Sequence, residues 1–433
     1  MIMQSRKPAR KNVKRKEHSV SELYLHGLAG VIGLGVLVIP VFISLVYGGP
    51  FSIYLVIAAG FIALLLAMLI YDISLTHNHD PYTFLKNSIS KEYSFIFGFL
   101  LLISFLITIT AAGIASVGEL TQFFGMNLYM SIAVVDILFV IMWIVMFYKK
   151  TRASLNFAGA LKILFVLLLI VIGVIALSAH GVRLTQTSFS FPSYVIAPFS
   201  FALLLFLWMY GGFEGASIVY RGENREKVAK AVILVIFTAI VIYSLVQLFV
   251  YETSSGISLT SLQLSSISVF TANVISTGFS LATQELVVGI SIIVILSAAF
   301  AVINASNHTL SDMAKDGLMP KFLVKDDNLK LLVSVAVPIV LITIFSSIVV
   351  LGPGVFIYIP IIIISALAFA AAFTFFAFGY MHYYTRKKDN ARILFGLFVG
   401  LLLLALIILT PAEFLIGLVI ILVVSLIGYS LLK

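Results

Sequence analysis

Two apolar segments of the chain contain residues that could bind a small charged ligand within a membrane. The first runs from Gly30 to Val36 and reads GVIGLGV, with Pro40 shortly after it. The second runs from Trp208 to Ser217 and reads WMYGGFEGAS. Glycine and proline both weaken a helix, so each segment is predicted to be a membrane helix that is interrupted near its middle.

An interrupted helix exposes backbone groups that can bind a ligand. The half-helix that begins near residues 34–36 offers free N–H groups and the positive end of its dipole, which suit a carboxylate. The half-helices that end near Val31 and Tyr210 offer free carbonyl groups, which suit an ammonium group. A zwitterion such as an α-amino acid fits both interruptions. The predicted substrate-binding residues are Val31, Ile32, Gly33, Leu34, Gly35, Val36, Trp208, Tyr210, Gly211, Gly212, Phe213 and Glu214.

Two ionisable residues lie deep inside predicted spans. Lys162 follows Lys150 by 12 residues, which places it roughly 18 Å into the membrane at 1.5 Å per residue. A buried ammonium group is costly, so Lys162 is predicted to carry the coupled proton or to replace a sodium ion as a fixed charge; the alternative is a snorkelling lysine. Glu214 could neutralise a cationic substrate, carry a proton or brace the unwound backbone, and we favour the brace.

Other polar residues within spans are weaker candidates. Ser297, Asn304, His308 and Ser311 share one helical face, which is predicted to line the permeation path or to form polar contacts between helices. Ser297 and Asn304 are therefore added to the candidate site. Asp136 is predicted only to hydrogen-bond between helices, and Glu119 receives no role.

The sequence gives little support to enzymatic or metal chemistry. It has no cysteine, no GxxxxGK[ST] phosphate-binding motif and no HExxH zinc motif. His77, His79 and Asp80 could hold a metal, but a solvated loop is the preferred interpretation. We therefore expect no enzyme, no cofactor and no metal site.

The elements that must position these residues are membrane helices. The chain has 433 residues, of which 61% are hydrophobic and 10% charged, and its mean hydropathy is +1.16; a soluble domain carries about 25% charge. Backbone polar groups in lipid must be satisfied internally, which predicts an all-α integral membrane protein. Twelve spans are predicted at 22–46, 50–76, 93–123, 128–148, 154–179, 194–220, 228–252, 278–311, 332–351, 355–380, 391–410 and 412–432.

The basic residues predict how these spans are oriented. If the N-terminus is cytoplasmic, 25 of the 27 Lys and Arg residues fall in segments on the inside or within the first three residues of the spans that follow them. Arg183 alone falls outside, and Lys162 lies within a span. Both termini are therefore predicted to be cytoplasmic in a multi-pass cell-membrane protein. The basic tail from Arg6 to Lys16 is predicted to lie against anionic lipid or to act as a plain topology signal. The uncharged loop at 253–277 is predicted to be an external cap or connector.

The two interruptions fall in corresponding spans of two five-helix blocks. Spans 1–5 and 6–10 enter the membrane in opposite senses, and matching breaks in such inverted repeats indicate a transporter site. Close helix packing is the alternative explanation for the glycines. The predicted organisation is a tail at 1–20, a first repeat at 21–190, a second repeat at 191–385 and two further helices at 386–433.

Three ordered motifs resemble the amino acid–polyamine–organocation (APC) transporters, amino acid permease type. The stretch from Gly30 to Val36 with Pro40 resembles their first-helix motif. The stretch from Leu207 to Ser217 resembles their sixth helix, and AKDGLMP at Ala314–Pro320 resembles the loop after their eighth helix. The resemblance covers roughly residues 20–430.

This resemblance implies a LeuT-like fold of five plus five helices and secondary transport of amino acids or related amines. It also implies that Lys162 lies beside the broken first helix and that Trp208 closes over the substrate; packing is the alternative for Trp208. Leu34 replaces a small polar residue of the family motif. The stretch Arg221-Gly-Glu-Asn-Arg225 keeps only Glu223 and Asn224 of the family pattern and lacks its proline.

The predicted function is proton-coupled symport of amino acids by alternating access. The first alternative is an ion-independent exchanger or facilitator of amino acids or polyamines with the same fold. The second is a receptor, or a subunit of a larger complex, that transports nothing. The predicted partners are the amino acid or amine substrate, the proton and the lipid bilayer, with no nucleic acid.

Overall fold

The structure is a computed structural model that describes residues 18–47, 51–77, 79–148, 151–180, 196–219, 224–253, 279–320, 323, 326–351 and 355–432. These residues form helices and short connections, and no strand occurs among them. The basic tail at Arg6–Lys16, nearly all of the loop at 253–277 and residues 221–223 lie outside the described residues.

Both predicted interruptions are present. Helix α1 (Val20–Val31) is followed by α2 (Leu34–Tyr47) with a bend of 44°, and α8 (Ile196–Met209) is followed by α9 (Phe213–Val219) with a bend of 43°. A capping box fixes the start of α1, because the Ser19 hydroxyl accepts a hydrogen bond from the Glu22 N–H at 3.2 Å. The chain is extended at Ile32, where α1 ends.

The remaining helices are long, with one exception. They are α3 (Phe51–His77), α4 (Pro81–Ser88), α5 (Lys91–Gln122), α6 (Leu128–Phe147), α7 (Thr151–His180), α10 (Arg225–Thr253), α12 (Leu281–Lys315), α14 (Asp327–Leu351), α15 (Val355–Lys387), α16 (Asn390–Ile408) and α17 (Ala412–Leu432).

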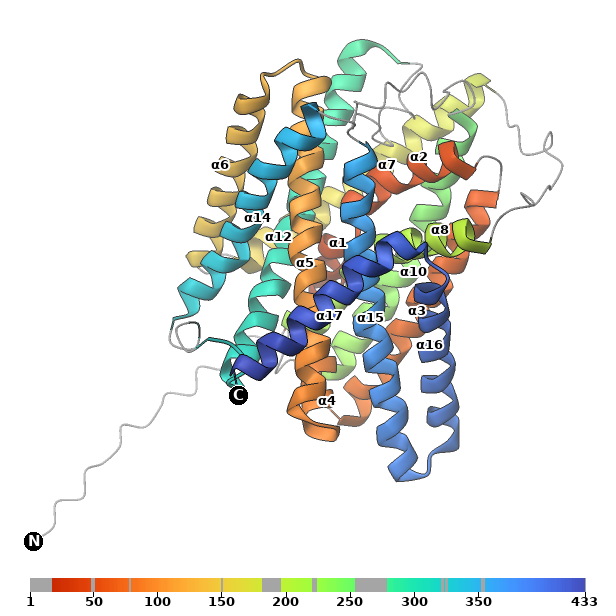
Figure 1. Cartoon of the computed structure of the whole chain (residues 1–433). Coiled ribbons are helices and arrows are strands. Elements are labelled where there is room, and N and C mark those ends of the chain that lie inside the picture. Colours follow the sequence, from red (N-terminus) through yellow and green to blue (C-terminus); the bar gives the residue numbers. More distant parts are fainter. Residues whose placement is uncertain are drawn as a thin grey trace, which may run out of the picture.

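Nine helices in the described part of the chain are long and apolar enough to cross a membrane, or up to eleven spans if each bent pair counts as one. Helix α17 is a further apolar helix, and it lies across α5 and α15 (Figure 1). The structure thus supports an all-helical membrane protein, while the count of twelve spans and the inverted repeat stay predictions.

The two broken helices lie in the interior of the bundle. Helix α1 packs against α7, α9, α10 and α12, and α8 packs against α2, α3 and α15. Helices α6, α14 and α16 lie at the periphery (Figure 1) and leave most of their residues exposed or half-buried. The interruptions are therefore shielded by other helices, which is the only setting in which unwound backbone is tolerated at membrane depth.

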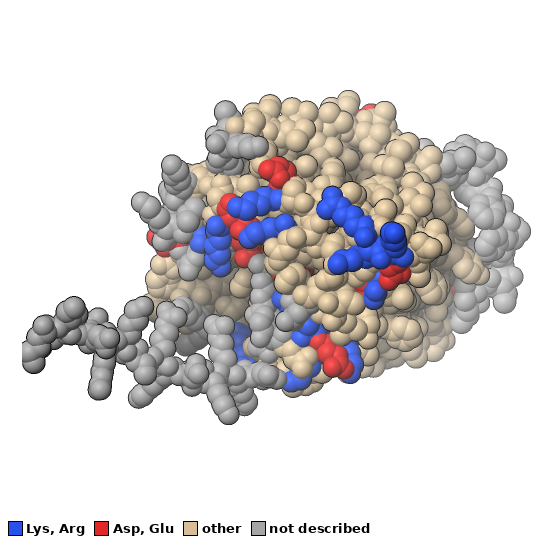
Figure 2. Space-filling model, turned by 90° about the horizontal axis from the view of Figure 1, so that it is seen from below, with Lys and Arg blue, Asp and Glu red and all other residues tan. Residues whose placement is uncertain are grey.

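Lys and Arg side chains gather at one end of the molecule, which we call the basic end (Figure 2). It contains the start of α5, the end of α12 and the turn between α15 and α16. Its exposed members include Lys91, Lys315, Arg386, Lys387 and Lys388. This distribution agrees with the alternation of basic loops along the sequence.

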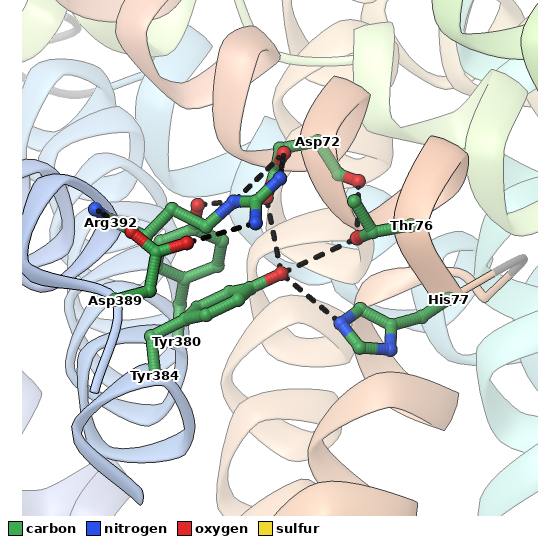
Figure 3. A network of polar contacts seen from close by, with 7 residues as sticks. All are labelled: Asp72, Thr76, His77, Tyr380, Tyr384, Asp389 and Arg392. Atoms are coloured by element: carbon green, nitrogen blue, oxygen red, sulfur yellow. Dashed lines mark hydrogen bonds and ion pairs between the residues drawn. The ribbon is translucent and has the colours of Figure 1, made fainter. Parts of the chain in front are cut away.

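A polar network joins α3, α15 and α16 at the basic end (Figure 3). The Asp72 carboxylate accepts hydrogen bonds from the Tyr380 hydroxyl at 2.8 Å and from the Arg392 guanidinium at 2.8 Å. The guanidinium also lies over the Tyr384 ring, 4.8 Å from its centroid. These contacts hold the ends of three helices together.

The prediction of a solvated loop at His77, His79 and Asp80 is wrong. The Asp80 side chain is buried and caps α4, where it accepts a hydrogen bond from the Thr83 N–H at 3.1 Å. His77 Nε2 lies 3.1 Å from the Tyr384 hydroxyl, and His79 Nε2 lies 3.1 Å from the Asn87 amide nitrogen. No group of three or more possible metal ligands occurs among the described residues.

Candidate functional site

The two interruptions meet backbone to backbone at the centre of the bundle. A Cβ atom built on Gly30 would lie 2.8 Å from the Gly212 carbonyl oxygen, and one built on Gly212 would lie 2.6 Å from the Gly30 carbonyl carbon. Gly212 also has a φ of +107°, a conformation that disfavours any side chain. Glycine is therefore required at both positions. At Gly30 the reason is the close approach of the two backbones, and at Gly212 it is both this approach and the positive φ.

A cavity of about 40 Å³ lies beside this contact. Helices α1, α2, α8 and α9 and the α8–α9 connection contribute Gly30, Val31, Leu34, Gly35, Trp208, Met209, Gly211, Gly212 and Glu214 to its lining. Helices α5, α12 and α15 contribute Ser104, Phe105, Thr108, Ala112, Ile295, Ala298, Ala299, Val302 and Phe369. Backbone from both interruptions therefore faces one shared space.

Glu214 braces the second interruption. Its side chain is buried, and both carboxylate oxygens accept the N–H of Gly212, at 3.1 and 3.0 Å. A carboxylate that accepts a backbone N–H stabilises an orphan donor of the unwound segment. Glu214 also lines the cavity, so it is the acidic group of the site.

Trp208 is held by a cluster of hydroxyl groups from α5 and α15. Its indole N–H lies 2.9 Å from the Ser365 Oγ and 3.2 Å from the Thr108 Oγ1. Ser365 in turn donates to the Ser104 carbonyl at 2.9 Å. These contacts fix the orientation of the ring that lines the cavity, and sequence analysis did not identify them.

A single tyrosine joins the ends of both half-helices. The Tyr243 hydroxyl, on α10, lies 2.8 Å from the Val31 carbonyl oxygen and 3.2 Å from the Met209 carbonyl oxygen. These carbonyls end α1 and α8, where no further turn of helix supplies a donor. The Tyr243 ring is fully buried, with its centroid 4.9 Å from that of the Tyr210 ring.

Lys162 lies on α7 against the end of α1. The side chain is completely buried, and its ammonium group donates a hydrogen bond to the Ala29 carbonyl oxygen. Gly159, one turn earlier, allows this contact, since a Cβ atom there would lie 2.4 Å from the Leu25 carbonyl oxygen. When Lys162 is protonated, its positive charge therefore lies at the negative end of the α1 dipole, just before the interruption.

Several predicted site residues lie near the cavity without lining it. Tyr210 points toward α3, and its hydroxyl donates to the Val56 carbonyl at 2.9 Å. Gly33 packs against Ala298. The other members of this group are Ile32, Val36, Phe213 and Lys162. Of the twelve predicted substrate-binding residues, seven line the cavity: Val31, Leu34, Gly35, Trp208, Gly211, Gly212 and Glu214.

The predicted polar face of the eighth span is only partly in the site. Ser297 lines neither this cavity nor the next, and its hydroxyl donates to the Val294 carbonyl of its own helix at 2.8 Å. Asn304 lines a second cavity of about 20 Å³ on the other side of the Gly30–Gly212 contact. Asp136 accepts a hydrogen bond from Thr343 at 3.2 Å, which is the predicted contact between helices.

Comparison with known proteins agrees with this architecture. The sequence model of the amino acid permease family matches residues 22–430, which include every residue that lines the cavity. None of the curated proteins compared with the chain matches it. Because the match covers far more than half of the chain, the protein belongs to the amino acid permease family of the APC superfamily.

Proposed function

We propose that the protein is a secondary active transporter that moves amino acids across the cell membrane by proton-coupled symport. The observation that carries the proposal is the cavity at which the backbones of both interruptions meet. Transporters with discontinuous helices bind substrates where half-helix ends converge near the bilayer midplane. Family membership supports amino acid transport in general; the coupling ion and the mode of transport are our inference.

The two charged ends of an α-amino acid have distinct partners in this proposal. The carboxylate binds at the start of α2, where Leu34 and Gly35 line the cavity at the positive end of the helix dipole. The ammonium group binds near the Val31 and Met209 carbonyls. Each carbonyl oxygen has two lone pairs, so the Tyr243 hydroxyl and the substrate can share it.

Lys162 couples transport to the proton gradient. Protonated, its ammonium group bonds to the Ala29 carbonyl and stabilises the end of α1 beside the cavity. Without its proton, the amine loses the charge that attracts it to the helix end, so α1 is freer to move. Proton release toward the cytoplasm would thus be linked to reorientation of the broken helix.

The proposal also covers the orientation of the protein in the membrane and the inverted repeat of its helices. The basic end is cytoplasmic, because basic loops are retained on that side of a membrane. The helices from α1 to α7 and from α8 to α15 form the two inverted repeats, since each block begins with a bent pair. Helices α16 and α17 complete twelve spans.

The test is uptake into proteoliposomes of the purified protein, with a labelled mixture of the common amino acids. Accumulation above equilibrium only with an inward proton gradient would support symport. Flux that requires only internal amino acid would indicate an exchanger and contradict the coupling. Competition by amines without a carboxyl group, equal to that by amino acids, would contradict the role of the α2 terminus.

A further inference from the structure

The first cavity and the second cavity are separated by a thin partition. Both are lined by Gly30, Phe105, Gly212 and Val302. The glycines contribute backbone only, so Phe105 is the largest side chain shared by the two spaces. It lies on α5 and is 4% exposed.

The side chains that line the first cavity offer few hydrogen-bonding groups or charges to a polar or charged substrate side chain. Ser104 and Thr108 are hydrogen-bonded to Ser365, and Glu214 accepts the Gly212 N–H. Among the described residues that line this cavity, none is Lys, Arg or His. An acidic substrate side chain would therefore have no positive charge to pair with, and burial of an unpaired charge is costly. The Glu214 carboxylate keeps spare acceptor capacity, so the limit on long basic side chains comes from the small size of the cavity.

The rest of the wall of the first cavity is apolar. It includes Phe105, Ala299, Val302 and Phe369. A buried water needs roughly 10–15 Å³ of such space, and the cavity holds about 40 Å³. This volume has room for roughly three to four water-sized groups, so we expect the cavity to favour the smallest amino acid side chains.

We propose that the substrates are small neutral α-amino acids, of the size of glycine, alanine and serine, and that Phe105 sets the upper size limit. The proposal rests on the proposed transport function. Removal of the Phe105 ring would join the first cavity to the second, which adds about 20 Å³ on the far side of the partition. A longer aliphatic side chain would then fit.

The test compares uptake of labelled glycine, alanine, leucine and arginine by the wild-type protein and by Phe105→Ala in proteoliposomes. One methylene group in an apolar pocket changes discrimination roughly 10- to 200-fold. We expect the wild type to take up alanine at least tenfold better than leucine or arginine. Phe105→Ala should raise the leucine-to-alanine ratio at least tenfold.

Phe99→Ala is the matched control, because Phe99 lies on the same helix, six positions earlier, and contacts Phe95 instead of either cavity. Its leucine-to-alanine ratio should equal that of the wild type. Ala299→Val tests the opposite direction, since it fills the first cavity; it should lower alanine uptake relative to glycine. If Phe105→Ala does not fold, Phe105→Val replaces it with the same expected direction.

The outcomes separate this inference from the transport proposal. Uptake of leucine or arginine by the wild type as fast as alanine would overturn the size and charge limit and leave amino acid transport intact. A ratio in Phe105→Ala equal to that in Phe99→Ala would overturn the role of Phe105. Absence of any amino acid flux in the wild type would overturn both proposals.

Discussion

Replacement of Tyr243 by phenylalanine tests whether the two half-helix ends are held together by one hydroxyl. The substitution keeps the ring, which packs against Tyr210, and removes the hydrogen bonds to the Val31 and Met209 carbonyls. Loss of a partner for a buried polar group costs about 1–3 kcal/mol. That free energy corresponds to a change of about 5- to 150-fold in an equilibrium constant.

We therefore expect Tyr243→Phe to raise the KM for substrate by a factor in this range. The matched control is Tyr358→Phe, because the fully buried Tyr358 hydroxyl also donates to a backbone carbonyl, that of Ala111, at 3.1 Å. Ala111 lies within α5 and not at a helix end. The control should lower thermal stability to a similar degree and leave KM close to the wild-type value. Equal KM values for Tyr243→Phe and Tyr358→Phe would refute the reasoning.

Three further substitutions test other contacts. Gly30→Ala should reduce uptake at least tenfold, since its Cβ atom would meet the Gly212 backbone at 2.8 Å and overpacking costs about 1–3 kcal/mol; Gly289→Ala, whose Cβ meets its nearest neighbour only at 3.9 Å, should retain uptake. Glu214→Gln should keep most uptake, because an amide oxygen can still accept the Gly212 N–H, whereas Glu214→Ala should lose it. Loss of uptake in both Glu214 variants would instead assign the carboxylate a charge-dependent role. Asp72→Asn should lower stability in detergent by roughly 1–3 kcal/mol without a change in substrate preference; a changed preference would show that the network at the basic end affects the site.

The sequence was informative where one residue type determines a local conformation. Glycines at 30, 33 and 35 predicted the first interruption, and α1 ends at Val31 with α2 beginning at Leu34. The second was predicted from Gly211 and Gly212 and follows Met209. Lys162 was expected to lie beside the first broken helix, and its contact with the Ala29 carbonyl places it there.

Contacts that depend on helix rotation or on distant segments were not predictable. Ser297 was assigned to the interior face, but a modest rotation of a long helix moves a polar residue away from the cavity. Nothing in the sequence next to Tyr243 or Phe105 indicates a role for either residue. The carbonyl partners of Tyr243 are about 30 and 210 positions away, and the role of Phe105 depends on where the cavity lies. Helix α4 did have a signal, since Asp80 precedes Pro81 in the arrangement of an N-cap and a first helical residue. Its eight residues are too few for a hydropathy pattern.

The central claim is that a protonatable lysine beside the broken first helix couples amino acid movement to the proton gradient. The most direct measurement is accumulation of labelled amino acid in proteoliposomes by Lys162→Ala, with and without an inward proton gradient. Lys330→Ala is the control, because Lys330 is also buried but lies at the start of α14, outside the cavity. We predict that Lys162→Ala exchanges internal for external amino acid yet fails to accumulate it, while Lys330→Ala accumulates it. Full gradient-driven accumulation by Lys162→Ala would contradict the account.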